Sequence, residues 1–458
     1  MKGDNMLKPW ILGLALGAAL AAPAPAATLS LTLAESEQAA VDASQSLKAA
    51  RLQAEAAKHL QDASWAQVLP RIGLDGNYRY VAEVPSLKLS PSAPPVQAGT
   101  NNNYSIGISA QWDLLSLPAI WRQYQGAEAN AKALGAAADQ AERQLRLQVR
   151  LAYFQTRLAA TQLHLYADAL TLAQSQDNDL ALRLKAGSSS RIDALEASND
   201  ELDRRSAYRV SQADLADALR SLFALTGQHK DADLSLPVDD AVGQSLPAKV
   251  AQPSLAVAME PSAGLLAALA GYESAPFKPL DLPQLRMMQA QVEAAQRQAQ
   301  AMWDGHLPTG TVGFRLSEDY PNLFFPTTVT QKTSSANFNL PLYSFGGTQA
   351  KADAQQASAD AQSQLMGAAG TNLERDYQSA RDRLAAMKDQ RDLQTLAAQQ
   401  AQQLRDLVYQ SYKVGGSTFL EVQSSSLKSL QANLALAITE TQMLIELADL
   451  AALTDSTR

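Results

Sequence analysis

Cysteine is absent from this chain of 458 residues, and the four histidines, His59, His164, His229 and His306, lie far apart in the sequence. Disulfide bonds, thiol catalysis and the closely spaced ligands of zinc sites are therefore excluded. No histidine stands where a catalytic triad would need it, so we expect neither an enzyme nor a bound cofactor or metal. A chain without thiols also tolerates an oxidising compartment.

Positive charge is in short supply as well. The sequence has 38 Lys and Arg against 46 Asp and Glu, which gives a formal net charge of -8. Binding to a phosphate backbone needs a basic stripe, and none stands out, so nucleic acid is not an expected partner. Long hydrophobic runs are missing beyond the first residues, which argues against transmembrane helices in the mature chain.

The first residues have the pattern of a secretory signal peptide, assigned to 1–26. Lys2 and Lys8 precede the apolar stretch "WILGLALGAALAA", and "APAPAA" then offers small residues before a cut near Ala26 or Ala27. The apolar stretch is shorter than the about 20 residues that span a bilayer. The mature chain is therefore expected to be exported, and it is not lipidated at a cysteine because no cysteine follows the cut.

Two short motifs recur in the two halves of the chain. "WAQVLP" runs from Trp65 to Pro70, "WDGHLP" runs from Trp303 to Pro308, and further residues around them match at the same offset. This duplication predicts an internal two-fold repeat. The two repeats and the proline-rich linker between them are placed at 27–227, 284–455 and 228–283.

Each repeat contains two segments in which apolar and polar residues alternate. In one of them, Tyr104, Ile106 and Ile108 alternate with Ser105 and Gly107. Alternation of period two is typical of a strand with one dry face and one wet face. The predicted strands are about 71–84, 103–115, 309–318 and 334–344.

Two interpretations of these strands remain open. They fit amphipathic hairpins on an ordinary soluble core. Charged residues on the polar faces, lengths near the 9–11 residues of a tilted transmembrane strand, and aromatic residues near the strand ends favour a lipid-facing barrel wall. Four strands are too few to close a barrel, and an open edge in lipid leaves backbone groups unpaired. Copies of the chain must then complete it, with two copies giving eight strands and three giving twelve.

Two long, proline-free segments, about 119–186 and 346–414, have the periodicity of coiled coils. At 1.5 Å per residue each predicts a helix of roughly 100 Å. Each segment ends at a glycine, Gly187 or Gly415, which suits a left-handed helix cap. Tip turns are predicted at 187–190 and 415–418, and each turn would join two helices into a hairpin.

The helices that follow these turns begin with matched polar pairs. Ser190 and Asp193 open the first, and Thr418 and Glu421 open the second. At this spacing a hydroxyl and a carboxylate form a capping box, in which they satisfy free backbone N–H groups.

In this order and in duplicate, the motifs resemble the TolC-like family of outer-membrane efflux proteins over nearly the whole mature chain. The stretches that carry the resemblance are "LTLAESEQAAVDAS", the paired "WAQVLP" and "WDGHLP", "GISAQWDLLS", "NFNLPLYSFGG", and the tips "LKAGSSSRIDALEAS" and "YKVGGSTFLEVQSS". The resemblance implies a mixed α and β membrane protein. It would be a homotrimer with a twelve-stranded β-barrel in the outer membrane of a Gram-negative bacterium, continued through the periplasm by an α-helical barrel of coiled-coil hairpins.

The resemblance also implies a function. Such a protein is the passive exit duct of a tripartite efflux or type I secretion system, fed by a periplasmic adaptor protein and an inner-membrane pump. The barrel–helix junctions are expected at Trp65, Pro70, Trp303 and Pro308. The tip residues expected to dock the adaptor are Lys185, Gly187, Ser188, Ser189, Lys413, Gly415, Gly416 and Ser417.

Asp193 and Glu421 occupy positions at which the family carries acids around the periplasmic entrance, so both are candidate gate residues. Helix capping alone would also explain both. A second acid and an arginine known in some relatives are replaced here by Ser424 and Ser417. A double acidic ring and an arginine lock in the second repeat are therefore not expected.

Two rival interpretations are weaker. An exported coiled-coil structural or adhesive protein would explain the helices but not the alternating strands. The Ser-x-x-Lys pattern from Ser425 to Lys428 lacks the further motifs of penicillin-binding proteins. No pattern in the sequence identifies a transported substrate.

Overall fold

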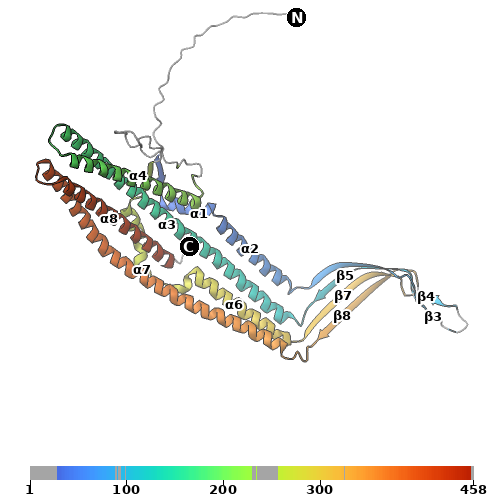
Figure 1. The fold of residues 1–458 in the computed structure, drawn as a ribbon. Coiled ribbons are helices and arrows are strands. Elements are labelled where there is room, and N and C mark those ends of the chain that lie inside the picture. The colour runs from blue at the N-terminus through green and yellow to red at the C-terminus, as the bar shows by residue number, and fades with distance from the viewer. Residues whose placement is uncertain are drawn as a thin grey trace, which may run out of the picture.

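The computed structural model describes residues 28–87, 90, 94–97, 99–229, 234, 256–323 and 325–454. The predicted signal peptide and most of the predicted linker lie outside these residues. Figure 1 shows a long body of helices with a narrow sheet at one end and two helical turns at the other.

Two helices run the length of the body: α3, Leu117–Lys185, and α7, Gly347–Lys413 (Figure 1). Their 69 and 67 residues correspond to roughly 100 Å each at 1.5 Å per residue. In the half of α3 nearer the sheet, the buried side chains are small, as at Ala129, Ala133 and Ala136. Small side chains let neighbouring helices approach closely, which suits a thin wall of packed helices.

Shorter helices lie end to end along the two long ones. α2, Gln45–Ala66, and α4, Arg191–Thr226, pack on α3. α6, Pro283–Trp303, and α8, Phe419–Thr454, pack on α7 and also contact α3. The pairs α3–α4 and α7–α8 are helical hairpins, and their turns lie at the same end of the body (Figure 1).

The sheet at the other end has four antiparallel strands in the order β2-β5-β7-β8. Its two central strands, β5 and β7, come from different halves of the sequence. A short outer hairpin of β3, Ser86–Leu87, and β4, Val96–Gln97, lies beyond its far end (Figure 1). The four main strands are β2, Arg71–Tyr80; β5, Asn102–Trp112; β7, Thr309–Tyr320; and β8, Val329–Asn339.

Two strands differ from their predicted bounds. β2 ends at Tyr80 instead of about residue 84, because only one further backbone bond, from Val81 to Asn101, continues its ladder with β5. β8 lies about five residues earlier than the predicted 334–344. Its ladder with β7 extends outward through polar residues such as Lys332, and it stops before Pro341, which has no N–H for a ladder. Apolar alternation alone did not mark the polar end of this strand.

Short elements wrap the middle of the body. β1, Thr28–Leu31, pairs in parallel with β6, Ala256–Met259. α1, Leu33–Ala43, follows β1 and packs on α3 and α4. After β6 come α5, Ser262–Leu269, and short 3-10 turns. The main hydrophobic core lies here, where Tyr153, Phe154, Leu222, Leu444 and Leu450 are fully buried.

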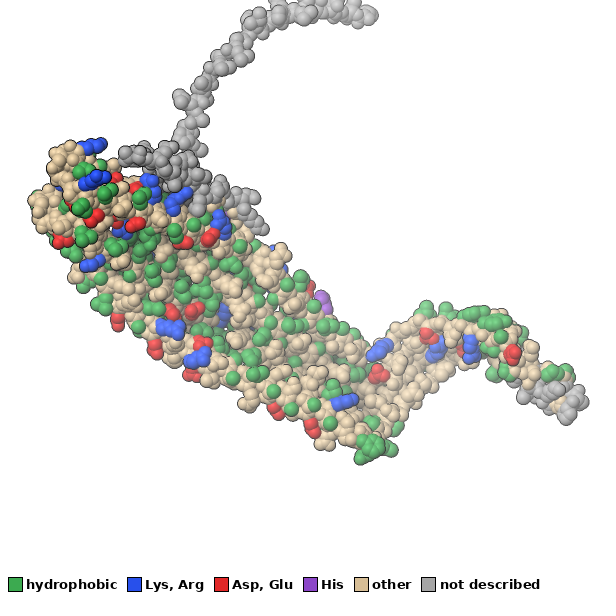
Figure 2. Space-filling model, in the orientation of Figure 1, with side chains coloured by type: hydrophobic (Ala, Val, Ile, Leu, Met, Phe, Trp, Pro, Cys, Tyr) green, Lys and Arg blue, Asp and Glu red, His purple; other side chains and the backbone are tan. Residues whose placement is uncertain are grey.

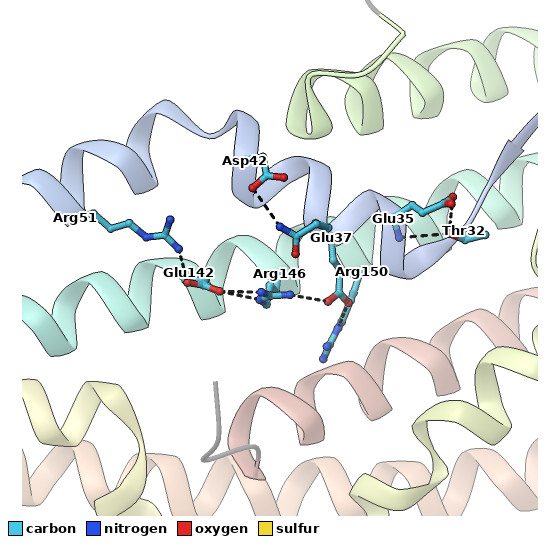
Figure 3. Close-up of polar contacts among 9 residues, drawn as sticks. Thr32, Glu35, Glu37, Asp42, Arg51, Glu142, Arg146 and Arg150 are labelled. Carbon is cyan, nitrogen blue, oxygen red and sulfur yellow. Dashed lines mark hydrogen bonds and ion pairs between the residues drawn. The ribbon is translucent and has the colours of Figure 1, made fainter.

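An ion-pair network fastens the N-terminal helices to α3 (Figure 3). The carboxylate of Glu37 in α1 accepts from Arg150 at 2.6 Å and from Arg146 at 3.3 Å. Arg146 also donates to Glu142 at 2.8 Å, and Glu142 accepts from Arg51 of α2 at 2.8 Å. Glu37 is buried, and the hydrogen bonds from two arginines offset the free-energy cost of removing its carboxylate from water. The network therefore holds α1 and α2 in place along α3.

Candidate functional site

The sheet has one apolar face and one polar face. Ile72 and Leu74 of β2, and Ile106 and Ile108 of β5, share one face and are exposed. Figure 2 shows hydrophobic side chains gathered along this end of the molecule. A large exposed apolar surface on a sheet marks a surface that contacts lipid or another protein.

Three tyrosines lie in a row across the apolar face, at the end of the sheet farther from the helices. Tyr78 of β2 is paired with Tyr104 of β5, which is paired with Tyr320 of β7. The Tyr104 and Tyr320 rings are stacked with their centroids 4.9 Å apart. Tyrosines with an apolar ring and a polar hydroxyl are typical of the level at which a membrane meets water.

The opposite face carries charge and hydrogen bonds. Arg315 of β7 reaches across β5 and forms an ion pair with Asp75 of β2, and it also donates to the hydroxyl of Ser105 at 3.0 Å. Gly107 of β5 is needed for this close packing, because a Cβ there would lie 2.6 Å from the Cβ of Ser317. A face of this kind is compatible with a water-filled lumen.

The sheet is not closed. In the described part of the chain, β2 and β8 each pair with one neighbouring strand and form the two edges. Their outward backbone groups need partners if the apolar face lies in lipid. Among the described residues, no helix is long and apolar enough to cross a membrane.

The predicted junction residues lie where helices give way to strands. Trp65, near the end of α2, packs edge-on against Trp121 and Tyr124 of α3 at 5.9 Å and 5.5 Å between ring centroids. Pro70 then precedes β2, and the Trp112 indole donates to the carbonyl of Val68 at 2.9 Å. The first junction is therefore held by aromatic packing.

The second junction has a different fastening. Trp303 ends α6, and Pro308 follows a 3-10 turn, Asp304–His306, just before β7. Arg122 of α3 forms an ion pair of 3.1 Å with the buried Asp304 and donates to the carbonyl of Gln300 at 3.2 Å. Arg122 therefore caps the C-terminus of α6, where a positively charged side chain interacts favourably with the helix dipole.

The two tip turns depend on glycine. Gly187 and Gly415 have φ values of 74° and 82°, in the region that favours glycine. The Ser188 amide donates to the carbonyl of Arg183 at 2.9 Å, and the Gly416 amide donates to that of Ser411 at 2.9 Å. The predicted docking residues Lys185, Gly187, Ser188, Lys413, Gly415 and Gly416 are exposed, and Ser189 and Ser417 are half-buried.

The two candidate gate acids have different surroundings. Glu421 is exposed and completes a capping box: its carboxylate accepts from the Thr418 amide at 2.9 Å, and its own amide donates to the Thr418 hydroxyl at 3.3 Å. Asp193 is half-buried, and its amide donates to the Ser190 hydroxyl at 3.1 Å. Glu421 therefore faces solvent as a helix cap, and Asp193 lies nearer the contact between the hairpins.

A contact that the sequence did not predict joins the two tips. The Arg183 guanidinium of α3 lies over the ring of Tyr412 of α7, 5.7 Å from its centroid, and pairs with Asp179 at 3.0 Å. Burial raises the pKa of the Tyr412 hydroxyl, and the Asp193 carboxylate raises it further. The only sequence signal was an aromatic residue three positions before the tip glycine, and such a residue does not name its partner.

An apolar cluster lies beside this contact. Leu180 of α3, Ala197 of α4, and Phe419 and Val422 of α8 are buried together. The Phe419 ring also meets Tyr412 edge-on, with 5.8 Å between centroids. This tip cluster, Leu180, Ala197, Phe419 and Val422, holds the two hairpins together near their turns.

A family model described as "Outer membrane efflux protein" matches residues 37–228 and 281–455. The chain belongs to the outer membrane efflux protein family. Both matched segments contain two of the sheet strands and one helical hairpin. Outer membrane efflux proteins are channels, so the exported adhesin and the serine enzyme are set aside. In agreement, the Ser425 hydroxyl is buried in α8 and bonds the carbonyl of Val422 at 2.9 Å.

Solved outer-membrane channels share the fold of this efflux protein. CmeC of Campylobacter jejuni matches with a TM-score of 0.74 and 13% identity, over 93% of this chain and 85% of that one. MtrE of Neisseria gonorrhoeae, in its open state, matches with a TM-score of 0.71 and 19% identity, over 92% and 88% of the two chains. VceC of Vibrio cholerae matches with a TM-score of 0.71 and 17% identity, over 92% and 96%. No curated protein matches the chain.

Proposed function

We propose that three copies of this efflux channel protein close a twelve-stranded barrel in the outer membrane of a Gram-negative bacterium. The observation that carries the proposal is the open four-stranded sheet with one apolar face and one polar face, whose edge strands β2 and β8 have no outer partner among the described residues. Because four is an even number, β8 of one copy runs antiparallel to β2 of the next copy. The antiparallel hydrogen-bond ladder then continues from copy to copy around the barrel, and no strand edge is left exposed to lipid.

The helical body offers matching surfaces for the same assembly. α7 and α4 have exposed apolar side chains on faces that the described residues leave uncovered, and such stripes are typical of helices that pack on another copy. On α7 these are Leu393, Leu396, Leu404 and Leu407, and on α4 they are Ile192, Leu195, Leu202 and Val210. Three copies would bury α7 of one against α4 of the next and form an α-helical barrel in the periplasm.

We further propose that this duct is the exit of a tripartite efflux or type I secretion system. The paired tip turns would dock a periplasmic adaptor, which links the duct to an inner-membrane pump. Family membership and the exposed turns at Gly187 and Gly415 support this role. Asp193, Glu421 and the Arg183–Tyr412 contact would line or hold the periplasmic entrance, with Trp65, Pro70, Trp303 and Pro308 at the barrel–helix junctions.

The test uses the mature chain purified in detergent. Light scattering should give a particle of about three chain masses, where the full-length chain has a mass of 49.0 kDa. Planar bilayers that receive this particle should show single-channel conductance. Monomers without conductance would contradict the proposal, and two-chain particles would favour an eight-stranded barrel instead. Cross-linking from Ser189→Cys or Ser417→Cys, in a chain with no other cysteine, should capture the adaptor in cells.

A further inference from the structure

The two halves of the chain pair their strands in the same register. The motifs "WAQVLP" and "WDGHLP" lie 238 positions apart, and the two tip glycines lie 228 positions apart. β2 and β5 pair Arg71 with Gln111. Moved by these two offsets, the pair becomes Thr309 with Asn339, which is the pair that β7 and β8 form. The repeat therefore extends to the hydrogen-bonding register of the strands.

Inside the chain, the two halves meet where β5 pairs with β7. These strands pair Trp112 with Val312, and beyond this pair the Leu115 amide donates to the carbonyl of Gly310 at 3.3 Å. The Leu115 side chain lies directly over Gly310, where a Cβ would come within 2.6 Å of it. The first half of the chain thus covers the start of the second half with a residue that follows β5.

The segment that follows β8 is not covered in this way by the described residues. Leu342, Tyr343 and Phe345 are 88%, 75% and 88% exposed, and Tyr343 is the counterpart of Leu115 in the repeat. The Tyr343 and Phe345 rings meet edge-on with 4.5 Å between centroids, and Phe345 has a φ value of 51°, which is uncommon for a bulky residue. These three residues form an apolar latch, and Figure 2 shows hydrophobic side chains projecting from the body at the corner between α7 and β8.

The opposite edge of the chain, at the α2–β2 junction, has matching groups. Trp65, Leu69 and Ile72 are all exposed there. The Val81 amide donates to the carbonyl of Asn101 at 2.7 Å, and bonding alternates along an antiparallel ladder, so the odd-numbered residues of β2 bond to β5. The carbonyl of Ile72 therefore points toward the free edge.

We propose that the β5–β7 contact inside the chain is repeated between copies, with β8 in the place of β5 and β2 of the next copy in the place of β7. The inference rests on the proposed function, because it requires copies that close a barrel. The apolar latch of one copy then covers the exposed α2–β2 junction of the next. The Tyr343 amide donates to the carbonyl of Ile72 in the next copy, as the Leu115 amide does to that of Gly310.

The same two offsets give the register between the copies. Applied to the β5–β7 ladder, they pair Leu340 of one copy with Leu74 of the next, and Ala336 with Tyr78. Apolar residues then face apolar residues, and a shift by one residue would turn every side chain of β8 to the other face. A shift by two residues would keep the faces, so the register needs a test of its own.

Cysteine pairs on the polar face test the register in a chain that has no cysteine of its own. Asn77→Cys with Asn337→Cys places the two thiols directly opposite each other, in a pair that is not bonded through the backbone. Oxidation of the mature protein in outer membranes should therefore link one copy to the next. Asn77→Cys with Ser335→Cys, or with Asn339→Cys, should link roughly tenfold less, because diagonal neighbours lie about 7–8 Å apart and exceed the reach of a disulfide.

A stronger link through Ser335→Cys or Asn339→Cys would overturn the proposed register. So would the absence of any link in particles that have three chain masses. Failure of the proposed function gives a different result, because the wild-type chain would then form no such particle.

The latch is tested by removing its rings. Tyr343→Ser and Phe345→Asn should each lower the temperature at which the three-chain particle separates, and asparagine suits the left-handed backbone at this position. Phe325→Asn is the matched control, because it removes an exposed ring at the far end of the sheet. Separation of both latch variants at the wild-type temperature would refute the latch.

A spin label identifies what covers the latch. In vesicles of phosphatidylethanolamine and phosphatidylglycerol, a nitroxide on Tyr343→Cys should be shielded from dissolved oxygen by the next copy. A nitroxide on Ile108→Cys, on the apolar face of β5, is the lipid-exposed control. Equal access of oxygen to both labels would show that lipid covers the latch, and would overturn its assignment to a second copy.

Discussion

The Tyr153 hydroxyl of α3 donates a hydrogen bond of 2.8 Å to the backbone carbonyl of Leu31 in β1. The same hydroxyl accepts from the amide of Glu260, just after β6, at 3.2 Å. One fully buried side chain therefore ties β1 and the residue that follows β6 to the longest helix. The contact joins segments that lie more than a hundred positions apart in the sequence.

Tyr153→Phe should lower the free energy of unfolding by about 1–3 kcal/mol, because it leaves the buried Leu31 carbonyl and the partly buried Glu260 amide without this partner. Thermal unfolding of the purified protein measures the effect. Tyr343→Phe, at a strongly exposed position, is the control and should change little. Equal midpoints for the two variants would show that the buried bonds do not stabilise the fold.

Tyr153 also predicts a loss of stability at alkaline pH. Burial raises the pKa of Tyr153 to about 12, whereas an unfolded tyrosine titrates near 10. The folded state therefore keeps its proton in a range where the unfolded state loses it, so stability falls as pH rises from about 10 to about 12. In Tyr153→Phe this alkaline decline should be smaller than in the wild type when unfolding is followed against pH.

Asp449, near the end of α8, is a position where a substitution should stabilise the protein instead of weakening it. Burial raises its pKa to about 6, the nearby Glu446 carboxylate adds to this, and Arg383 opposes it. Asp449 lines a cavity together with Asp376 and Arg143 of the neighbouring helices. The protonated form is favoured on folding, so the contribution of Asp449 to stability is fully present below about pH 4 and is lost as pH rises through about 6.

Asp449→Asn should therefore stabilise the protein at pH 7, by about 1 kcal/mol after allowance for partial solvent exposure. The gain should vanish near pH 4, where the wild-type carboxyl also loses its charge. Unfolding midpoints at the two pH values test this directly. A gain of the same size at both would point to packing and not to charge.

The network of Figure 3 predicts that Glu37 is essential for anchoring α1. Glu37→Ala should cost about 2–4 kcal/mol of stability, because it leaves the largely buried Arg146 and Arg150 without their shared carboxylate. Asp217→Ala breaks the exposed pair with Arg220 and should cost at most about 0.5 kcal/mol. Denaturant unfolding of both variants compares them, and similar losses would contradict the assigned role of burial.

Gly107 should tolerate no side chain. Gly107→Val would force its Cβ to within 2.6 Å of the Ser317 Cβ and separate β5 from β7. Gly76→Val is the matched control on the neighbouring strand, because a Cβ there meets its nearest atom at 3.8 Å. The yield of assembled, heat-resistant oligomer in the outer-membrane fraction should fall strongly for Gly107→Val only. Equal yields would show that the strands can adjust.

Glu421 can be tested as a charge and as a cap separately. Glu421→Gln removes the charge and retains a residue that suits the capping box, so it should weaken the attraction of cations at the entrance and leave stability unchanged. Glu421→Ala should also lose about 1 kcal/mol of stability through the missing cap. Cation block in single-channel recordings and thermal midpoints measure the two effects. Unaltered cation block in both variants would leave capping as the only role of Glu421.

The elements of this fold follow closely from local patterns. Alternation around Tyr104 and Ile106 predicted β5, the glycines at 187 and 415 predicted the tip turns, and Thr418 with Glu421 predicted a capping box that the structure contains. These features depend on neighbours within a few residues, so a single sequence is enough to recognise them. The polar outer end of β8 was missed because it lacks alternation.

The partners in the candidate site could not be predicted in the same way. Tyr412 meets Arg183, and Arg315 meets Asp75, across separations of more than two hundred residues. A local pattern carries no information about which distant side chain will lie opposite. Asp193 and Glu421 looked equivalent in the sequence, yet one is half-buried beside Tyr412 and the other is an exposed cap.

By itself, the sequence predicted the two long helices, the tip turns and the alternating strands with their apolar and polar faces, and its lack of cysteine and its net negative charge excluded some kinds of chemistry. Periodicity and composition can be read from the sequence without knowledge of the fold, because neither depends on which distant segments pack together. Only the tertiary structure decided which faces meet, as at the open sheet edges and the Arg183–Tyr412 contact. These depend on how two long helical hairpins pack, and packing is a relation between distant segments.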